Sequence, residues 1–485
     1  MTVPFTYQTL QNQTRRSFLG KSSTGIGLAA LVGLLEQDQL LGAGPSGFSF
    51  PNFAPKAKRV VVLWQGGGPS HIDLLDPKPK LTEMAGKDIP GSVRGDTRLS
   101  TMSSNYKAWP CVPEIKPFEK YGKCGTEIST MLPNLGKLAD DLCIVRSLNT
   151  EAVNHAPGVT FMMTGSQIPG RPSMGAWLTY GLGSESKDLP AFVVMTSTDK
   201  GKTCGQLFYD YYWGSGFLPS KYQGVKFSSS GAPVPYLENP PGVSKAGRRA
   251  LLDNLARMNQ AHLEGYGDPE IETRISQYEM AFRMQTSVPD LVDFKSEPEH
   301  VLKRYGPDVS KRGTFANNCL TARRLLERGT RFVQLMHSGW DQHGNLFTQL
   351  EQQCVDTDAP SAALIQDLKE SGLLEDTLVI WGGEFGRTPF GQYRSGDPKK
   401  PTGRDHFGRA YSWIMAGGGL KPGSTYGETD EFGWNITKDP VHVHDMQATI
   451  LHLCGIDHTK LTYRYQGRRF RLSDVHGHVV KGILA

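Results

Sequence analysis

Short runs of consecutive apolar residues recur along the chain and predict buried strands. Six of them are rich in β-branched or aromatic residues, and they cover 59–64, 142–145, 191–195, 331–336, 377–381 and 411–416. A continuous apolar run, rather than an alternating one, is typical of a strand that is buried on both faces.

Segments with apolar residues at helical spacing alternate with these runs. They cover 317–328, 359–370 and 445–453, and the first two end at or near Gly329 and Gly372. Strands that alternate with helices predict a mostly parallel sheet covered on both faces. We therefore predict an α/β fold, a three-layer αβα sandwich.

This alternation breaks between about 200 and 312. The segment begins rich in tyrosine, glycine and proline and becomes helical from about 245 to 285. We interpret it as a large insertion, or cap, that covers one end of the sheet. Its aromatic residues either contribute to substrate binding or pack the insertion on the core, and the sequence leaves both open.

The first 45 residues have the pattern of an export signal. Arg15 and Arg16 form a twin-arginine signature, and the apolar stretch 25–35 that follows is too short to span a bilayer comfortably. We predict a twin-arginine signal segment over 1–45, read by the twin-arginine export machinery, and a periplasmic or extracellular protein without a stable membrane span. The alternatives are an accidental Arg-Arg pair before a buried helix and a retained N-terminal anchor.

Composition and charge exclude some classes of protein. The chain is 38% hydrophobic and 21% charged, which is ordinary for a globular protein. Its formal charge of +5 comes from 53 basic and 48 acidic residues spread along the whole length. A nucleic-acid-binding protein usually has a clustered basic face, so we expect no nucleic-acid partner.

Four segments next to predicted strands hold an unusual share of residues that can bind metals. They are 66–73, 337–344, 382–388 and 404–408. Ligands bind at the carboxyl ends of the strands in this fold class, so these segments are expected to meet there. Imidazole and carboxylate groups suit zinc, manganese or iron. A single histidine at a strand end is more often a structural residue, and the coincidence of four segments favours a metal site.

Two arginines within these segments, Arg387 and Arg404, could hold a phosphate or sulfate through paired hydrogen bonds. The alternative is an ion pair with Glu384 or Asp405.

The same segments carry a family resemblance. They read Gly-Gly-Pro-Ser-His-Ile-Asp at 67–73, Gly-Trp-Asp-Gln-His at 339–343, Gly-Glu-Phe-Gly-Arg-Thr-Pro at 383–389 and Gly-Arg-Asp-His-Phe at 403–407. They resemble the domain-of-unknown-function family numbered 1501, which is commonly placed beside the sulfatases and alkaline phosphatases. The resemblance runs from about 58 to 482 and implies one alkaline phosphatase-like domain over that range.

The resemblance also implies a site with one or two divalent ions, zinc, manganese or calcium. The residues that match metal-binding positions are Asp341, His343, Glu384 and His406, with Asp73 or His71 in place of an acidic residue of the first strand. Phe385 stands where a further ligand would be. Asp405 is expected to orient His406, although it could itself bind metal.

The position of the superfamily's nucleophile holds His155 instead of Ser, Thr or Cys. His155 could be a nucleophile, a general base or a metal ligand, or the covalent step could be lost. We predict that His155, Arg387 and Arg404 are the catalytic residues.

Two functions remain open on the sequence. The first is an exported, metal-dependent hydrolase of phosphate or sulfate esters, acting on a phosphorylated or sulfated small molecule or polysaccharide. The second is a non-catalytic envelope or carbohydrate-binding protein that retains the fold, which Phe385 and His155 favour.

Overall fold

A computed structural model describes residues 49–97, 99–197, 208–235, 237–393 and 402–485 of the chain. The predicted twin-arginine segment, residues 1–45, lies outside the described residues. Among the described helices, none is both long and apolar enough to cross a membrane.

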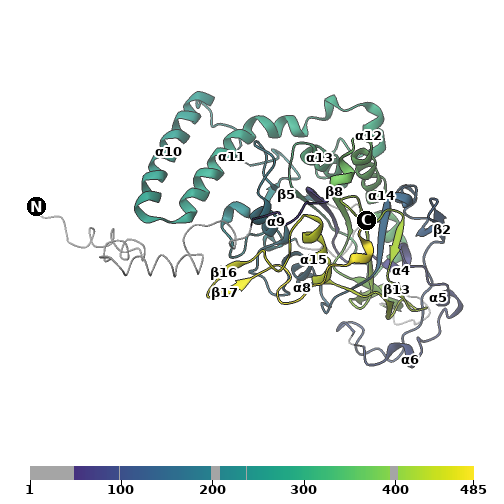
Figure 1. Ribbon diagram of the computed structural model, residues 1–485. Coiled ribbons are helices and arrows are strands. Elements are labelled where there is room, and N and C mark those ends of the chain that lie inside the picture. The colour runs from purple at the N-terminus through teal and green to yellow at the C-terminus, as the bar shows by residue number, and fades with distance from the viewer. Residues whose placement is uncertain (1–48, 98, 198–207, 236, 394–401) are drawn as a thin grey trace, which may run out of the picture.

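One large sheet lies at the centre of the molecule (Figure 1). Its strands, in spatial order, are β12 (Ser424–Tyr426), β4 (Leu142–Asn149), β11 (Tyr411–Ala416), β8 (Thr377–Gly382), β1 (Arg59–Gln65), β7 (Phe332–His337), β5 (Phe192–Ser197) and β6 (Val225–Phe227), and β15 (Val441–His442) pairs with β4. All neighbouring strands are parallel except at β11, which is antiparallel to both β4 and β8. All six predicted strands are therefore confirmed, and all lie in this sheet.

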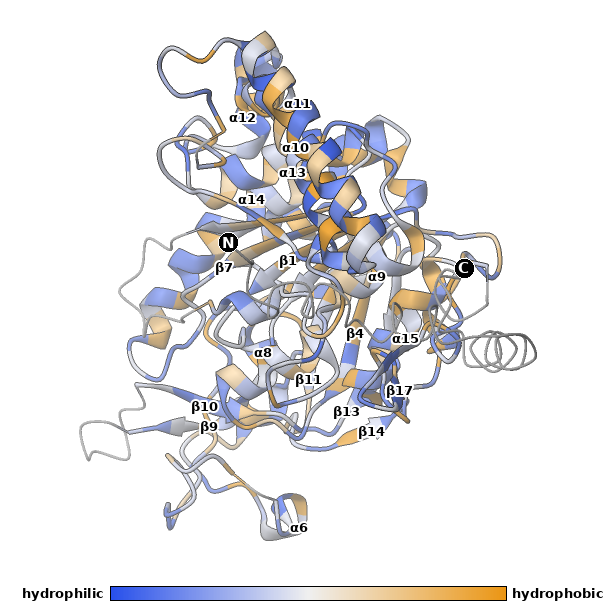
Figure 2. Ribbon diagram, turned by 90° about the vertical axis from the view of Figure 1, so that its left-hand side faces the viewer, coloured by the Kyte–Doolittle hydropathy of each residue, from blue (hydrophilic) through white to orange (hydrophobic). Residues whose placement is uncertain are grey.

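Helices cover both faces of the sheet (Figure 2). The helices α13 (Phe315–Glu327) and α14 (Leu346–Glu370) pack on one face, and α8 (His155–Thr164), α9 (Met174–Leu182) and α15 (Val443–Leu453) pack on the other. Side chains of β1 alternate between the two layers: Val61 and Leu63 face the first, and Val62 and Trp64 face the second. Each buried side chain of this kind stabilises the fold by about 1.5–3 kcal/mol. The predicted three-layer αβα sandwich with a mostly parallel sheet is confirmed.

The segment that breaks the alternation forms a long helical hairpin, α10 (Lys245–Tyr266) and α11 (Pro269–Val292), which stands out from the body (Figure 1). Helix α12 (Glu299–Tyr305) leads back to the body, where it packs on α13 and α14. The segment is not purely peripheral, because its strand β6 forms the edge of the central sheet.

Smaller elements complete the fold. They are the short helices α4 (His71–Leu74), α5 (Pro79–Glu83), α6 (Gly91–Arg94) and α7 (Pro133–Gly136), and the strand pairs β2 (Phe118–Tyr121) with β3 (Thr126–Ser129), β9 (Gly386–Gln392) with β10 (Gly403–Phe407), β13 (Glu428–Thr429) with β14 (Ile436–Lys438), and β16 (Tyr463–Tyr465) with β17 (Arg468–Phe470). The β9–β10 pair crosses the carboxyl edge of the sheet and has an irregular register between Arg404 and His406. Pro389 lies opposite this irregular stretch. Proline has no backbone N–H to donate, and at this point the two strands have no regular hydrogen-bond ladder for it to interrupt.

Candidate metal centre

The site forms where several chain segments meet at one edge of the sheet. Asp341 and His343 follow β7, whose carboxyl end lies at this edge. His406 lies on β10, which precedes β11, and because β11 is antiparallel its first residue lies at the same edge. His155 is the first residue of α8, after β4. The direction of β11 thus explains why a segment before a strand reaches the same site as segments after strands.

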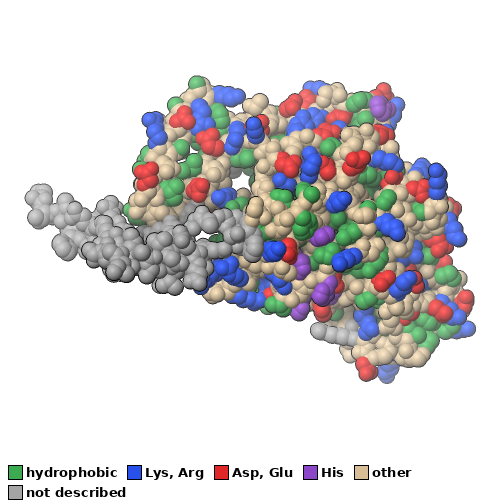
Figure 3. Space-filling model, in the orientation of Figure 1, with side chains coloured by type: hydrophobic (Ala, Val, Ile, Leu, Met, Phe, Trp, Pro, Cys, Tyr) green, Lys and Arg blue, Asp and Glu red, His purple; other side chains and the backbone are tan. Residues whose placement is uncertain are grey.

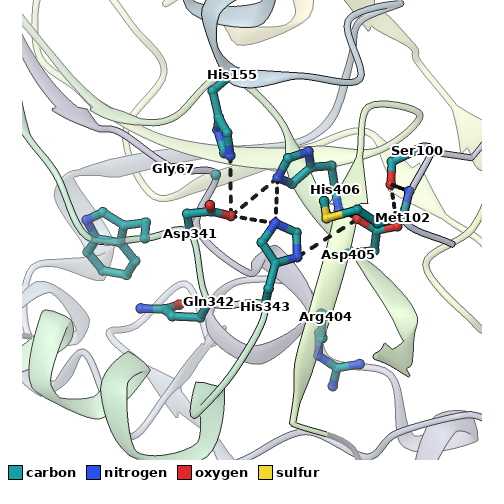
Figure 4. A network of polar contacts seen from close by, with 12 residues as sticks. Gly67, Ser100, Met102, His155, Asp341, Gln342, His343, Arg404, Asp405 and His406 are labelled. Carbon is teal, nitrogen blue, oxygen red and sulfur yellow. Dashed lines mark hydrogen bonds and ion pairs between the residues drawn. The ribbon is translucent and has the colours of Figure 1, made fainter. Parts of the chain in front are cut away.

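One carboxylate oxygen lies at the centre of the cluster (Figure 4). Oδ1 of Asp341 is 2.8 Å from Nε2 of His343 and 3.3 Å from Nε2 of both His155 and His406. The Nε2 atoms of His343 and His406 are 2.9 Å apart. The four ligand atoms all lie within 4.8 Å of one another. A tetrahedral ion with bonds of about 2.0–2.1 Å needs ligand atoms at about these separations.

The second ring nitrogen of each histidine faces a hydrogen-bond acceptor. Nδ1 of His343 is 2.6 Å from Oε1 of Gln392, Nδ1 of His406 is 2.9 Å from the carbonyl oxygen of Val153, and Nδ1 of His155 is 2.6 Å from Oε1 of Glu384. Each Nδ1 therefore carries the proton and donates it, which leaves a lone pair on each Nε2.

Lone pairs without protons between them repel one another unless a cation lies among them. Nε2 of His155 is buried and has no hydrogen-bond partner among the described residues, and the same is true of Oε2 of Glu384. Buried polar atoms in native proteins almost always have partners, so orphaned atoms in a cluster of acceptors are typical of an ion site. The residues present therefore fit a divalent metal ion.

The electrostatics of the cluster point the same way. Burial acts to raise the pKa of Asp341, but Arg387 and the three histidines outweigh it and hold the pKa well below its ordinary value. Burial lowers the pKa of His406 to about 4, although the nearby Asp341 carboxylate acts to raise it. Asp341 is thus ionised and His406 is neutral near pH 7, which are the states in which both groups bind metals.

His155 differs from the other two histidines. Burial acts to lower its pKa, yet the nearby Asp341 carboxylate and the hydrogen bond to Glu384 raise the pKa above the ordinary value. Its side chain is also the most exposed of the cluster, at 16%. His155 therefore lies at the mouth of the site and binds protons more readily than His406.

Glu384 is not one of the four residues whose ligand atoms converge, but it contacts one of them. Its Oε1 accepts hydrogen bonds from His155 and, at 3.0 Å, from the backbone N–H of Gly67. Gly67 has a φ of 121°, and a Cβ there would lie 2.5 Å from the backbone nitrogen of Asp341. A side chain at position 67 would therefore displace the loop that carries Asp341.

Phe385 packs against the histidines, with its ring centroid 4.6 Å from that of His406 and 5.0 Å from that of His155. The ring closes the apolar side of the site, and Phe385 offers no ligand atom.

The structure gives Arg387 a different role from the predicted one. Its buried guanidinium donates to Oδ1 of Asp341 at 2.8 Å and to the carbonyl oxygens of Gly67, Gly68, Trp340 and Arg404. These acceptors engage all three nitrogen atoms of the guanidinium, so Arg387 ties together the loops around Asp341.

Arg404 and Asp73 form a second buried ion pair away from the cluster, and the guanidinium of Arg404 points away from the histidines in Figure 4. The carboxylate of Asp73 receives two hydrogen bonds from Arg404 and others from Ser70 and the backbone of Ile115. Both groups are satisfied by the protein. Asp73 and Arg404, predicted as a metal ligand and a catalytic residue, pair with each other in the structure, and neither belongs to the four-residue cluster.

His71 and Asp405 also lie outside the four-residue cluster. Nδ1 of His71 faces the backbone N–H of Arg387, and burial lowers the pKa of His71 to about 4. Asp405 accepts hydrogen bonds from Ser100, Ser103 and the backbone N–H of His406. Its Oδ1 lies 4.0 Å from Nδ1 of His343, so Asp405 supports the ligands and contributes none of the four.

Two supporting groups carry no signal in the sequence. Gln392 lies on β9, and its side-chain oxygen accepts a hydrogen bond from Nδ1 of His343. The carbonyl oxygen of Val153 accepts one from Nδ1 of His406. A glutamine and a backbone carbonyl are too common to stand out, and only the folded hairpin brings them to the imidazoles.

The fold and the cluster together define an α/β sandwich protein with a candidate metal centre at the carboxyl edge of its sheet. A family model described as "Protein of unknown function (DUF1501)" matches residues 57–484. The chain belongs to this family, as the sequence motifs predict.

No curated protein matches the sequence. Solved structures resemble it distantly. The PsFucS1 sulfatase from Pseudoalteromonas sp. has 13% identity and a TM-score of 0.34, over 88% of this chain and 71% of that one. The alkaline phosphatase from the Antarctic bacterium TAB5 has 11% identity and a TM-score of 0.31, over 82% and 98%. The C-terminal periplasmic domain of EcEptC from Escherichia coli, in complex with zinc, has 8% identity and a TM-score of 0.33, over 85% and 86%.

Structural similarity this low does not indicate a function. A function has to be argued from the residues of this chain.

Proposed function

We propose that this protein is a metal-dependent hydrolase of phosphate or sulfate esters. The single observation that carries the proposal is the convergence of Asp341, His343, His406 and His155, whose ligand atoms lie within 4.8 Å of one another. Asp341, His343 and His406 hold the ion in this proposal. The coordination position next to His155 stays open for water or substrate, as a catalytic site requires.

A divalent ion bound there would polarise the ester and lower the pKa of water. His155 accepts the proton of the attacking water at Nε2, because its Nδ1 proton is already held by Glu384. Glu384 fixes the ring and stabilises the charge that His155 gains, as the carboxylate of a carboxylate–histidine pair does. His155 is thus a general base in our proposal rather than a nucleophile.

The ligand set favours one ion of zinc or manganese over calcium. Imidazole nitrogens suit zinc and manganese, whereas calcium prefers six to eight oxygen ligands. The four ligand atoms have a single focus at Oδ1 of Asp341, and Glu384 is held by His155 and Gly67. We therefore expect one ion rather than two.

The second candidate is a binding protein that keeps the fold without turnover. Phe385 at a ligand position favours it, and so does the engagement of Arg387 and Arg404 by protein acceptors. For either function, the Arg15-Arg16 signature supports the proposal that the protein is exported by the twin-arginine route.

The test is to purify the protein, measure bound metals by elemental analysis and assay aryl phosphates and aryl sulfates before and after chelation. We expect about one equivalent of zinc or manganese and an activity that the chelator removes and the metal restores. Bound metal without turnover of either ester would favour the binding protein. Absence of metal together with chelator-resistant turnover would contradict the metal-dependent mechanism.

A further inference from the structure

The β16–β17 hairpin presents aromatic and basic side chains side by side, away from the residues of the metal centre. Its sequence, from 463 to 471, is Tyr-Arg-Tyr-Gln-Gly-Arg-Arg-Phe-Arg. Gln466 and Gly467 form its two-residue turn, and both have positive φ, 48° and 83°. This turn geometry matches the twist of a hairpin, so the two strands hold their side chains in a fixed register.

Tyr465 forms an exposed ring platform on this hairpin. One face of its ring stacks on Phe217, with centroids 5.0 Å apart and planes at 14°. Phe217 in turn contacts Trp177, a fully buried residue of α9. Tyr465 is nevertheless 40% exposed, because the core covers only one side of it.

Arg468 lies directly across the strand pair from Tyr465. Its guanidinium lies 4.7 Å over the ring of Phe470 and pairs with Asp474, yet its side chain is 51% exposed. Asp474 also pairs with Arg171, at 2.9 Å, so two guanidinium groups share one carboxylate. The pair of arginines therefore keeps a net positive charge, and Arg468 is held over the ring of Phe470, across the strand pair from Tyr465.

The charge extends beyond these two residues. Arg464 and Arg469 are exposed and lie directly opposite each other in the hairpin. Figure 3 shows basic side chains gathered over β16 and β17, with histidines on the same face.

Arg471, which directly follows the hairpin, lines a polar pocket of about 880 Å³. This pocket is lined by both basic and acidic groups, among them Arg471, His444, His458, Glu151 and Asp445, so it lies beside the hairpin without being part of the proposed surface.

We propose that the β16–β17 hairpin is a docking surface for a sulfated polysaccharide. The exposed face of Tyr465 stacks on a sugar ring, and the fork of Arg468 binds a sulfate group on the same or the next sugar. The surface is separate from the metal centre, so this binding does not depend on the proposed hydrolase activity.

An exposed ring with an exposed guanidinium directly across the strand pair favours this ligand over a lipid surface. Membrane-bound surfaces insert apolar side chains, whereas the exposed residues of this hairpin, 464–469, include three arginines and one aromatic residue. A single-stranded nucleic acid could use the same chemistry, and the experiment separates the two.

The experiment measures binding of the full chain to dextran sulfate, neutral dextran, oligothymidylate and phosphatidylglycerol vesicles, at low and high salt. The variants are Tyr465→Ala, Tyr465→Phe and Arg468→Gln, with Arg257→Gln on the exposed face of α10 as a control of equal charge change. Arg468→Gln and Tyr465→Ala should each weaken binding of dextran sulfate by about tenfold. Tyr465→Phe keeps the ring and should bind like the unmodified protein, and so should Arg257→Gln.

Neutral dextran should bind more weakly than dextran sulfate, and high salt should weaken binding of the latter. All four variants should have the melting temperature of the unmodified protein, which shows that they fold whether or not the protein hydrolyses esters. An equal loss with Arg257→Gln, or no loss with Tyr465→Ala and Arg468→Gln, would overturn the proposal. Tighter binding of oligothymidylate or of the vesicles than of dextran sulfate would also overturn it, and would assign the surface to that ligand.

Discussion

Oδ1 of Asp341 contacts three imidazole nitrogens and the guanidinium of Arg387 within 3.3 Å. At this scale the hydrogen bonds behind the ligands decide their chemistry, because they set which nitrogen of each ring carries the proton. The sequence predicts Asp341, His343 and His406 as ligands and His155 as a catalytic residue, and the structure brings these four together. It does not bring Asp73, His71 or Arg404 with them, since a residue type in a motif does not reveal its partners.

Gln392 should tune the metal affinity without touching the metal. Gln392→Ala removes the acceptor of the Nδ1 proton of His343, so the ring can turn or change its tautomer. We expect metal affinity to fall by about 10–100-fold, measured by competition with a chromophoric chelator. Gln466→Ala in the exposed turn is the matched control and should leave the affinity unchanged. An unaltered affinity in Gln392→Ala would show that this hydrogen bond does not orient His343.

Glu384 should affect turnover more than metal binding. Glu384→Gln keeps the size of the side chain but removes the charge that stabilises protonated His155. We expect turnover of an aryl ester to fall by about 10²–10⁴-fold while the bound metal stays near one equivalent. The two measurements are turnover number and elemental analysis of the same preparation. Loss of the metal in parallel with turnover would instead make Glu384 a ligand, as the sequence resemblance implies.

At the scale of elements, close backbone contacts hold the ligand segments together. Strand β10 passes against the loop that carries Asp341 and His343. A Cβ at Gly403 would lie 2.2 Å from the carbonyl oxygen of Gln342 and 2.4 Å from the carbonyl carbon of His343. The sequence does not single out Gly403 as a contact, because the two segments are 60 residues apart and only the fold opposes them.

Gly403→Ala should therefore damage the site although no ligand changes. The added methyl group meets backbone atoms that cannot turn away, so strand and loop must separate, at a cost of about 1–3 kcal/mol. We expect a lower midpoint of urea unfolding and a lower metal content than in the unmodified protein. Gly91→Ala is the control, since a Cβ there meets nothing within 4 Å. Equal metal content in the two variants would show that the loop tolerates the methyl group.

At the scale of the whole molecule, the candidate ion would link segments from positions 155 to 406 across the sheet edge. Because the unfolded chain does not keep these ligands together, metal binding adds directly to the stability of the fold.

Removal of the metal should lower the stability of the entire domain. A free ion concentration of about 100 times the dissociation constant stabilises the folded state by about 2.7 kcal/mol. We expect the melting temperature to fall on chelation and to rise with added zinc in a concentration-dependent manner, measured by differential scanning calorimetry. The Asp341→Asn variant should show neither response. A melting temperature that is independent of metal in the unmodified protein would argue against a site of useful affinity.

The sequence by itself determined the fold class, since runs such as 59–64 and 377–381 must be buried on both faces, and burial on both faces requires two helical layers. It also determined which segments could supply ligands, because they follow or precede those strands. Only the tertiary structure decided which side chains face one another: the antiparallel direction of β11 and the β9–β10 pair bring His406 and Gln392 to the site, whereas Asp73 and Arg404 satisfy each other elsewhere. Local pattern fixes an element and its buried faces, but ligand geometry depends on contacts between residues tens to hundreds of positions apart.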